Sequence, residues 1–403
     1  MKNRQDQHKA VFTRDFLLIF LAGGLIRICY QIQGTVMPLY GNELGFTAVM
    51  VGTTTTVCTA ASLILRPVLG IWLDRYGRRI IVLCGTGLFV LATWLCGLTG
   101  SFAVLLLLRA LQGFGFAAHT TAVNTMATDV LPEERMAEGI GYMGLTGSVS
   151  LALAPALALT LVEGGRYRQG FHFAFIVGAL AVFCLLAVRS VVGREQAAPS
   201  ASGTYQGWER FWEKEALKPA FIMLILGACY AGVSTFLAIY ALGKGFSSSQ
   251  VSVYFTVNAV ATAVARLVGS SAMRRIGMRK GMFAASGLCV SAFLLIPVSS
   301  SAVGLWAAAA LHGLGYGTIY PQLNALAVTR AAPERRGTAM ATFLTGMDIG
   351  VGFGAGFWGF IIDRIGMDKM FHICAAVTVL VYVAYRLLLP AGDGKGANKG
   401  RLR

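Results

Sequence analysis

The sequence is poor in charge. Only 13% of its 403 residues are Asp, Glu, Lys or Arg, about half of what a soluble protein usually carries, whereas 56% are hydrophobic. A soluble globular chain is therefore excluded. The sequence also lacks a G-x-x-x-x-G-K-[ST] phosphate-binding loop, a metal-ligand cluster and an exposed Ser-His-Asp arrangement. We expect no ATPase activity, no enzyme of another class, no bound metal and no cofactor.

Two marks of a secreted protein are missing as well. All eight cysteines fall inside apolar runs, so no disulfide framework across loops is predicted. The N-terminal stretch MKNRQDQHKAVFTRDF has neither the short apolar core nor the cleavage site of a signal peptide. We therefore expect the first apolar run to be retained as a membrane span.

Long apolar runs dominate what is present. About 20 mostly apolar residues are needed for a helix to cross a bilayer. Twelve runs meet this length, at approximately 15–40, 48–73, 80–98, 102–130, 137–162, 171–192, 219–243, 250–273, 280–299, 302–329, 337–362 and 369–389. They are continuous rather than alternating, which favours helices over the strands of a membrane barrel. The predicted class is an all-α polytopic membrane protein with twelve transmembrane helices.

The net charge of +16 has a topological explanation. With both termini in the cytoplasm, 25 of the 34 Lys and Arg residues lie in inner loops and tails. The outer loops hold five, namely Arg166, Arg168, Lys244, Arg364 and Lys369. Such a bias orients membrane proteins. We therefore predict a multi-pass protein of the bacterial inner (plasma) membrane with both termini cytoplasmic, and no nucleic-acid partner.

The chain repeats itself at an offset of 200 residues. RPVLGIWLDRYGRR (66–79) corresponds to RLVGSSAMRRIGMR (266–279), and ALQGFGFA (110–117) corresponds to ALHGLGYG (310–317). Later matches, such as Pro132 with Pro333, slip by one residue. An even number of spans per half gives both halves the same orientation. Six helices therefore repeat as six helices, in two parallel pseudo-repeats.

The predicted domains follow from this repeat. They are an N-terminal six-helix bundle (1–192), a cytoplasmic linker (193–218), a C-terminal six-helix bundle (219–390) and a basic, disordered tail (391–403). In the linker, Trp208, Phe211 and Trp212 share a helical face. This pattern favours either an amphipathic helix on the membrane surface or a tether whose aromatic side chains rest on the bundle.

The loop after the second run concentrates charge. Gly70 and Asp74 lie one turn apart, Gly77 allows a tight left-handed reversal, and Arg75, Arg78 and Arg79 favour the cytoplasmic side. Asp74 at the membrane edge needs a partner, either one of these arginines or a neighbouring helix N-terminus. We predict that these six residues form a conformational latch, which is broken when the two halves repack.

At this point the sequence resembles a known family. G-x-x-x-D-R-x-G-R-R in this loop is similar to the signature of the major facilitator superfamily, and RALQGFGFA (109–117) resembles that family's R-x-x-x-Q-G-x-G-x-A. The overall pattern is most similar to the bacterial arabinose- or drug-efflux-like branch. The resemblance implies the fold of that superfamily and secondary transport by alternating access, in which two halves rock around a central site.

Two departures from the family pattern stand out. In the second half Arg274 replaces Asp74, so the latch is asymmetric. The fifth-helix motif associated with exporters expects Gly-Pro and paired glycines, whereas this chain has Gly147 followed by Ala154-Pro155. The helix can still bend at Pro155, but this motif supports export less strongly.

Charges inside apolar runs are candidate functional residues, because they are costly to bury in lipid. They are Arg27, Arg66, Arg109, Arg266 and Asp348. The resemblance implies a cavity lined by the first, fourth, seventh and tenth helices. The candidate substrate residues on those helices are Arg27, Tyr30, Gln31, Arg109, Gln112, Phe116, His119, Tyr230, His312 and Tyr316, and the candidates for proton coupling are Asp348, His119 and Arg109.

Each candidate also has a purely structural interpretation. Arg27 either contacts solute or supports a carbonyl, and Arg109 is either the family's proton-transfer arginine or a side chain that reaches toward the interface. Arg66 and Arg266, near helix ends, favour structural roles. His119 and His312 either titrate near neutral pH or are simply hydrogen-bonded. Asp348 is either a proton site or a hydrogen-bond acceptor between the halves.

GFGFAA (113–118) superficially matches a dinucleotide fingerprint, but it lies inside an apolar run with no preceding strand. Its glycines favour close helix packing instead. We predict a monomeric, proton-coupled exporter of a small organic solute, with Arg27 and Arg109 favouring anionic or zwitterionic solutes. The alternatives are uptake of an anion or sugar by proton symport, and a membrane sensor that transports nothing.

Overall fold

A computed structural model describes residues 12–132, 135–189, 212–332 and 335–389. The regular secondary structure of these residues is helical. The long helices of the first half are α2 (Arg14–Glu43), α3 (Ala48–Tyr76), α4 (Arg78–Cys96), α5 (Phe102–Val130), α6 (Met136–Leu161) and α7 (Tyr167–Leu186), with a 3-10 turn, η2 (Glu163–Gly165), before α7. Those of the second half are α8 (Lys214–Gly243), α9 (Ser248–Ile276), α10 (Met278–Val298), α11 (Ala302–Arg330), α12 (Arg336–Ile365) and α13 (Met367–Leu388).

These helices confirm the predicted runs, with ends that differ by a few residues. Eleven of the described helices are long and apolar enough to cross a membrane. The remaining long helix, α11, is diluted by the stretch HGLGYGTIYPQLN (312–324). Polar residues inside a span usually serve function, so this dilution directs attention to α11.

The repeat is kept in the backbone more strictly than in the sequence. Each long helix of the second half begins 200 positions after its counterpart, from α2 at Arg14 and α8 at Lys214 to α7 at Tyr167 and α13 at Met367. The slippage seen at Pro132 and Pro333 therefore does not shift the helix starts.

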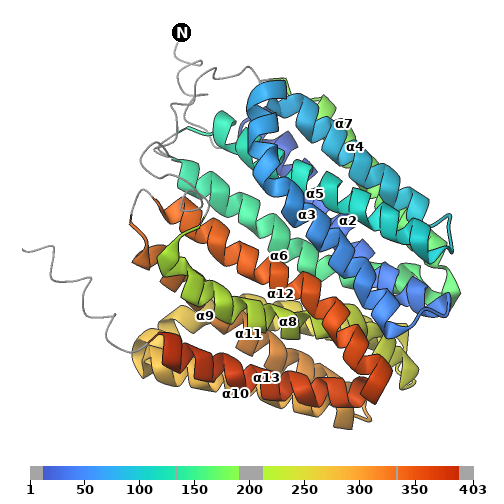
Figure 1. The fold of residues 1–403 in the computed structure, drawn as a ribbon, viewed down its shortest axis with the longest axis vertical. Coiled ribbons are helices and arrows are strands. Elements are labelled where there is room, and N and C mark those ends of the chain that lie inside the picture. The colour runs from blue at the N-terminus through green and yellow to red at the C-terminus, as the bar shows by residue number, and fades with distance from the viewer. Residues whose placement is uncertain (1–11, 133–134, 190–211, 333–334, 390–403) are drawn as a thin grey trace, which may run out of the picture. The chain divides into compact units, whose positions relative to one another are not determined.

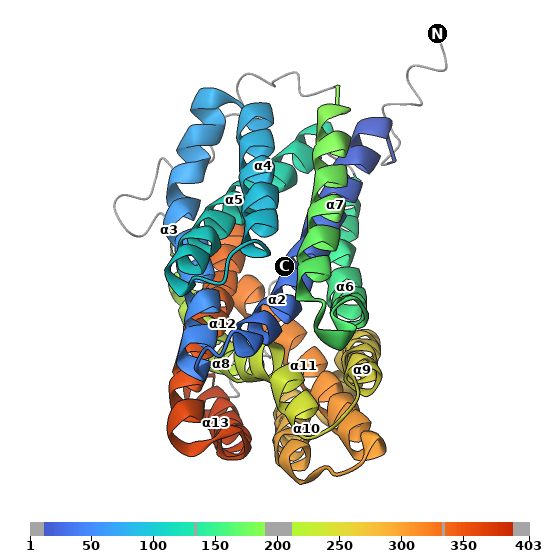
Figure 2. The same ribbon diagram turned by 90° about the vertical axis from the view of Figure 1, so that its right-hand side faces the viewer.

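The chain divides into two compact units. The first comprises 1–200, 233–256 and 352–364, and the second comprises 201–232, 257–351 and 365–403. The first unit thus contains α2 to α7 together with end segments of α8, α9 and α12. Within it, α5 packs against α3 and α4 (Figure 1), and α2 packs against α6 and α7 (Figure 2). Within the second unit, α10 packs against α11 and α13.

Large apolar side chains cover the outside of the helices. Leu267, Leu387 and Phe183 are 79%, 74% and 68% exposed, respectively. Side chains of this kind are costly in water but suit the hydrocarbon of a bilayer. The chain is therefore a multi-pass membrane protein. All eight cysteines lie in described helices and are free.

The two glycines of GFGFAA hold α5 against different neighbours. A Cβ on Gly113 would lie 2.1 Å from the carbonyl oxygen of Cys58 on α3. A Cβ on Gly115 would lie 2.6 Å from the carbonyl oxygen of Gly85 on α4. The predicted packing role of these glycines is confirmed, because only a hydrogen at each position allows the backbones to approach this closely.

Gly77 makes the reversal between α3 and α4. Its φ of 83° is positive, as the sequence predicts, but its ψ of 150° lies outside the left-handed helical region. That combination is nearly confined to glycine. Gly277 repeats it with φ 87° and ψ 145°. The prediction of a glycine turn is confirmed, but the predicted left-handed conformation of Gly77 was wrong.

Gly113→Ala is expected to destabilise the protein strongly, because the new methyl group would overlap the Cys58 carbonyl. Overpacking of this kind usually costs about 1–3 kcal/mol. Gly87→Ala on α4 is the matched control, since nothing lies within 4 Å of its Cβ position. Thermal unfolding of the purified variants measures the difference, and equal melting temperatures would contradict the packing role of Gly113.

Candidate functional site

Three aromatic rings meet in the N-terminal half. Tyr30 on α2 stacks on Phe116 on α5, with ring centroids 4.1 Å apart and planes at 17°. Phe89 on α4 lies 5.9 Å from Phe116. The sequence analysis gave Tyr30 and Phe116 as candidate substrate residues in different apolar runs, and the structure brings them together. Phe89, from an apolar helix, was missed.

His119 lies one turn beyond Phe116 and is 1% exposed. Its Nδ1 is 2.8 Å from the Thr86 hydroxyl on α4. Gly85 makes this contact possible, because its Cβ position lies only 3.2 Å from the His119 backbone nitrogen. Leu65 and Leu69 of α3 pack beside the neighbouring residues Ala117 and Ala118. The His119 ring is therefore buried beside an apolar cluster and contacts the Thr86 hydroxyl.

The hydrogen bonds around Thr86 determine which nitrogen of His119 carries the proton. The Thr86 hydroxyl donates its single hydrogen to the Val82 carbonyl, at 2.5 Å. It must therefore accept a hydrogen from His119, which places the proton on Nδ1. Nε2 is then a lone-pair acceptor, and it is buried with no hydrogen-bond partner among the described residues. His119 thus presents an unused proton acceptor inside the bundle.

Arg27 lies on α2 one turn before Tyr30, whose ring stacks on Phe116. It is half-buried, and its Nη1 lies 3.3 Å from the Cβ position of Gly147 on α6. A larger residue at Gly147 would displace the guanidinium. The N-terminal half therefore combines a cation, an aromatic stack and a proton acceptor on neighbouring helices.

Arg109 joins three helices and is only 3% exposed. Its Nε donates to the Thr54 carbonyl on α3 at 3.1 Å, and its Nη1 donates to Gln112 Oε1 at 2.9 Å. Gln112 Nε2 donates in turn to Thr93 on α4 at 3.1 Å. Arg109 does not reach outward toward the interface. Its geometry is that of a structural node that ties α5 to α3 and α4.

Gln31 and Gln33 differ in their surroundings. Gln31, a predicted site residue, is half-buried, and its backbone carbonyl accepts a hydrogen bond from the Thr35 hydroxyl. Gln33 is 1% exposed, and both polar atoms of its amide have no partner among the described residues. A buried amide without partners is unfavourable by about 1–3 kcal/mol. Sequence reasoning missed Gln33, although it lies on α2 only two residues after the candidate Gln31.

The C-terminal half contains an aromatic column. Tyr230 on α8 stacks on Tyr316 on α11 with centroids 5.0 Å apart, and Tyr320 continues the stack at 6.2 Å from Tyr316. Arg266 on α9 lies over the Tyr320 ring at 5.6 Å, a cation–π contact that agrees with a structural role. His312 lies next to Tyr316 at 5.9 Å. Tyr230, His312 and Tyr316, all candidate substrate residues, thus lie together, and their role in binding solute stays a prediction.

His312 has the opposite tautomer to His119. The amide nitrogen of Asn258 on α9 donates to the Ala309 carbonyl at 3.1 Å and lies 2.9 Å from His312 Nδ1. An amide NH₂ only donates, so Nδ1 is the acceptor and Nε2 carries the hydrogen. His312 is therefore a hydrogen-bonded histidine, as its structural interpretation holds. Asn258, which sets this tautomer, was missed.

Asp348 is half-buried on α12. Its roles as a proton site or as a hydrogen-bond acceptor both stay predictions. Arg66, likewise half-buried, lies ten residues before the end of α3, and its structural role stays a prediction.

The 70–79 loop is bound to its own half. Arg78 forms an ion pair with Asp129 at the end of α5, with a distance of 2.6 Å, and Arg79 donates to the Leu186 carbonyl at the end of α7 at 3.3 Å. Asp129 was not recognised from the sequence. The side chains of Asp74 and of its replacement Arg274 lie outside the described residues, so the predicted partner of Asp74 stays a prediction.

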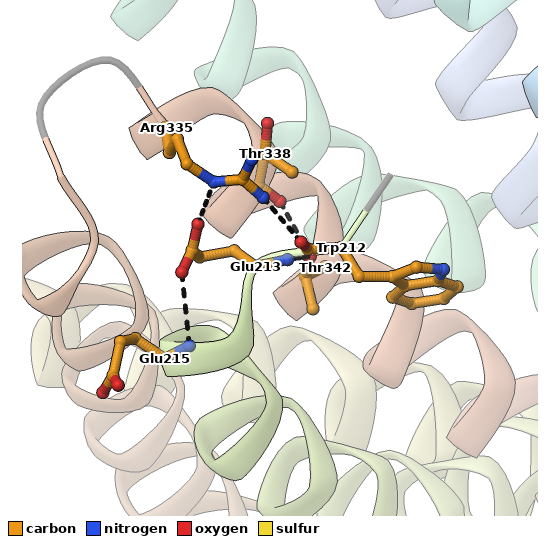
Figure 3. Close-up of polar contacts among 6 residues, drawn as sticks. All are labelled: Trp212, Glu213, Glu215, Arg335, Thr338 and Thr342. Atoms are coloured by element: carbon orange, nitrogen blue, oxygen red, sulfur yellow. Dashed lines mark hydrogen bonds and ion pairs between the residues drawn. The ribbon is translucent and has the colours of Figure 1, made fainter. Parts of the chain in front are cut away.

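Two residues of the predicted linker (193–218), Trp212 and Glu213, are fixed to the start of α12 (Figure 3). The Arg335 guanidinium forms an ion pair with Glu213 and donates to the Trp212 carbonyl at 2.6 Å. The Glu213 backbone donates to Thr342 at 3.1 Å. In the first half, the counterpart Arg135 pairs with Glu138 on its own helix. The predicted amphipathic face at Trp208 and Phe211 lies outside the described residues.

A family model described as the Major Facilitator Superfamily matches residues 19–269 and 244–402. The chain belongs to this superfamily. The staphylopine export protein of Staphylococcus aureus (strain Mu50) is 23% identical to this chain over 400 residues. The match covers 95% of this chain and 98% of the relative. The quinolone resistance protein NorA of Staphylococcus aureus (strain MRSA252) is 26% identical over 257 residues, 62% of this chain and 63% of the relative.

Solved structures share the fold of this superfamily member. The nucleoside transporter NupG matches with a TM-score of 0.76 at 15% identity, over 94% of this chain and 100% of that chain. A bacterial homologue of the human lysosomal transporter Spinster matches with a TM-score of 0.74 at 20% identity, over 93% and 96% of the two chains. The predicted family and fold class are confirmed.

Arg109→Lys is expected to lower thermal stability, because an ammonium group cannot span both the Thr54 carbonyl and Gln112. The loss of hydrogen bonds from a buried charged donor costs about 1.5–3 kcal/mol. Arg168→Lys, at an exposed position on α7, is the control and should leave the melting temperature unchanged. If Arg109→Lys kept full stability but lost proton coupling, the structural role would be wrong.

Proposed function

We propose that this superfamily member exports a small zwitterionic organic solute in exchange for protons, by alternating access. The observation that carries the proposal is the half-site on α2, α4 and α5. There the stacked rings of Tyr30 and Phe116 join the turn of α2 that carries Arg27 to the turn of α5 that carries His119, whose buried Nε2 lone pair has no partner among the described residues. The similarity to an export protein over 95% of the chain supports the direction.

The chemistry of His119 favours exchange for one type of solute. A carboxylate of the solute would bind the Arg27 guanidinium, and an ammonium or other N–H group would donate to Nε2. A proton bound at Nε2 would remove that acceptor, so proton and solute compete for one lone pair. Competition for a shared site is the thermodynamic basis of antiport.

A simple anion would behave differently. It would neutralise Arg27 and thereby favour a positive charge on His119, so proton and anion would bind together. That arrangement gives symport, the alternative function. The solute class and the transport direction are thus linked, and an amino-acid-derived zwitterion fits export. The stacked aromatic rings of Tyr30 and Phe116 would pack against its apolar part.

The remaining parts of the proposal follow the sequence. Arg and Lys in the predicted inner loops support cytoplasmic termini in the inner membrane. We propose a monomer without cofactor that performs no covalent chemistry. Asp348 remains a second candidate for the proton that biases the halves.

Flux in inverted membrane vesicles tests the direction of transport. With the vesicle interior acidified, wild-type protein should accumulate amino-acid-derived zwitterions from a metabolite library, and a protonophore should abolish accumulation. Arg27→Ala should reduce this flux at least tenfold, because it removes the carboxylate partner; a tenfold loss corresponds to about 1.4 kcal/mol of binding free energy. Accumulation that requires the opposite gradient would support symport and contradict export.

Thr86 provides a test of the proton site. Thr86→Val removes the acceptor that holds His119 Nδ1–H, and this bond stabilises the charged ring more than the neutral ring. The pH at which protons half-inhibit solute binding should move down by about one unit. Thr86→Ser should restore the wild-type pH profile. An unchanged profile in Thr86→Val, with solute still bound, would exclude His119 as the competing site.

A further inference from the structure

A carboxylate from α12 binds the start of α3. Asp363 Oδ1 accepts a hydrogen bond from the Ala48 backbone N–H at 2.8 Å, and Oδ2 accepts one from Val49 at 2.9 Å. Thr47 caps the next free N–H, that of Met50, at 3.3 Å. The first N–H groups of a helix have no partner within it and carry partial positive charge. Asp363 therefore completes the α3 N-terminus from more than 300 residues away in the sequence.

Asp363 belongs to a second copy of the loop signature. GIWLDRYG (70–77) and GFIIDRIG (359–366) both fit G-x-x-x-D-R-x-G. The first copy covers the end of α3, and the second covers the end of α12 and stops directly before α13. The turn glycines agree in backbone conformation, since Gly366 has a φ of 87° and Gly77 a φ of 83°. This copy falls outside the repeat at 200 residues, so the sequence comparison of the two halves does not reveal it.

The first glycine of the second copy allows the contact. A Cβ on Gly359 would lie 2.3 Å from the Ala48 carbonyl oxygen. One turn further along α3, a Cβ on Gly52 would lie 2.1 Å from the Ala355 carbonyl oxygen. Thr56 then donates to the Gly352 carbonyl at 2.6 Å. The first turns of α3 and the last turns of α12 therefore touch backbone to backbone, with Asp363 at the end of this contact.

The repeat supplies a natural comparison. Glu163 occupies the position 200 residues before Asp363, at the end of α6. Among the described residues, its carboxylate takes no hydrogen bond, and only its backbone carbonyl accepts one, from Arg166. The counterpart helix α9 is capped locally, by Ser247 and Gln250 bonding each other's backbone N–H groups. The long-range cap is therefore particular to Asp363.

We propose that Asp363 is a conformational latch that holds α3 and α12 together at the end of α3 opposite to the 70–79 loop. This inference rests on alternating access in the proposed function. For that end to open, α3 and α12 must separate, which leaves two N–H groups and one carboxylate to be solvated. The latch therefore favours the closed state of that end and sets how readily it opens.

The test measures opening directly. Thr59 on α3 packs against Gly352, where a Cβ would lie 2.6 Å from Thr59, so a Thr59→Cys reporter should react with a hydrophilic maleimide only after separation. Labelling is measured in open membrane fragments, with the parent chain as the background for the native cysteines. Asp363→Asn should raise the reporter rate about threefold to tenfold. Glu163→Gln, the matched control, should leave it unchanged.

A second variant removes the donor instead of the acceptor. Ala48→Pro deletes one N–H at the first helical position, where proline is well accepted, and the preceding Thr47 already has the extended backbone that proline requires (φ −65°, ψ 161°). Ala48→Pro should also raise the labelling rate of the Thr59→Cys reporter. It replaces Asp363→Asn as the test if that variant is not recovered from membranes. Wild-type labelling rates in these variants, or an equal rise in Glu163→Gln, would overturn the latch. Labelling needs no solute or proton gradient, so this outcome is independent of the export test.

Discussion

A buried guanidinium determines the polar interior of the N-terminal half. Arg109 carries donors that water would satisfy in a soluble protein, whereas lipid offers none. The nearby helices must therefore supply acceptors, and they do so through the Thr54 carbonyl and the Gln112 side chain. The close approach that this requires is provided by Gly113 and Gly115. The same approach of α4 to α5 presses Thr86 onto His119, so the structural node and the proton acceptor depend on one packing arrangement.

The two halves share a backbone but not a chemistry. Arg109 and Gln112 correspond to Ala309 and His312, so the second half fills the place of the cationic node with a neutral histidine. Thr86 and His119 correspond to Ser286 and Ile319. Ser286 keeps a buried hydroxyl with no partner among the described residues, as expected where its histidine has become isoleucine. The buried Arg109–Gln112 node and the unpaired His119 Nε2 thus lie in the first half, and the stacked tyrosines lie in the second.

The sequence predicted features that depend on one helix or on its repeat. Apolar runs gave the spans, and Tyr30, Phe116, Tyr230 and Tyr316 were all selected as candidate cavity residues before the structure showed that they stack in pairs. It did not predict partners chosen by packing between helices. Asp129 pairs with Arg78 because two helix ends converge, and no spacing along the chain encodes that. The tautomer of His119 depends on where the single hydroxyl hydrogen of Thr86 points, which needs the Val82 carbonyl in place.

The two ends of α3 are held in different ways, and this difference bears on how the molecule switches. Directly beyond its C-terminal end, Arg78 and Arg79 at the start of α4 bind α5 and α7, within the same half. At its N-terminal end, α3 is bound by Asp363 of α12, and Thr56 of α3 donates to the Gly352 carbonyl of α12, a helix of the other repeat. Because α3 packs along α5, it is expected to move with its own half. In the proposed alternating access, the bonds between α3 and α12 must then break when that end opens, which is why the proposed latch is placed at Asp363.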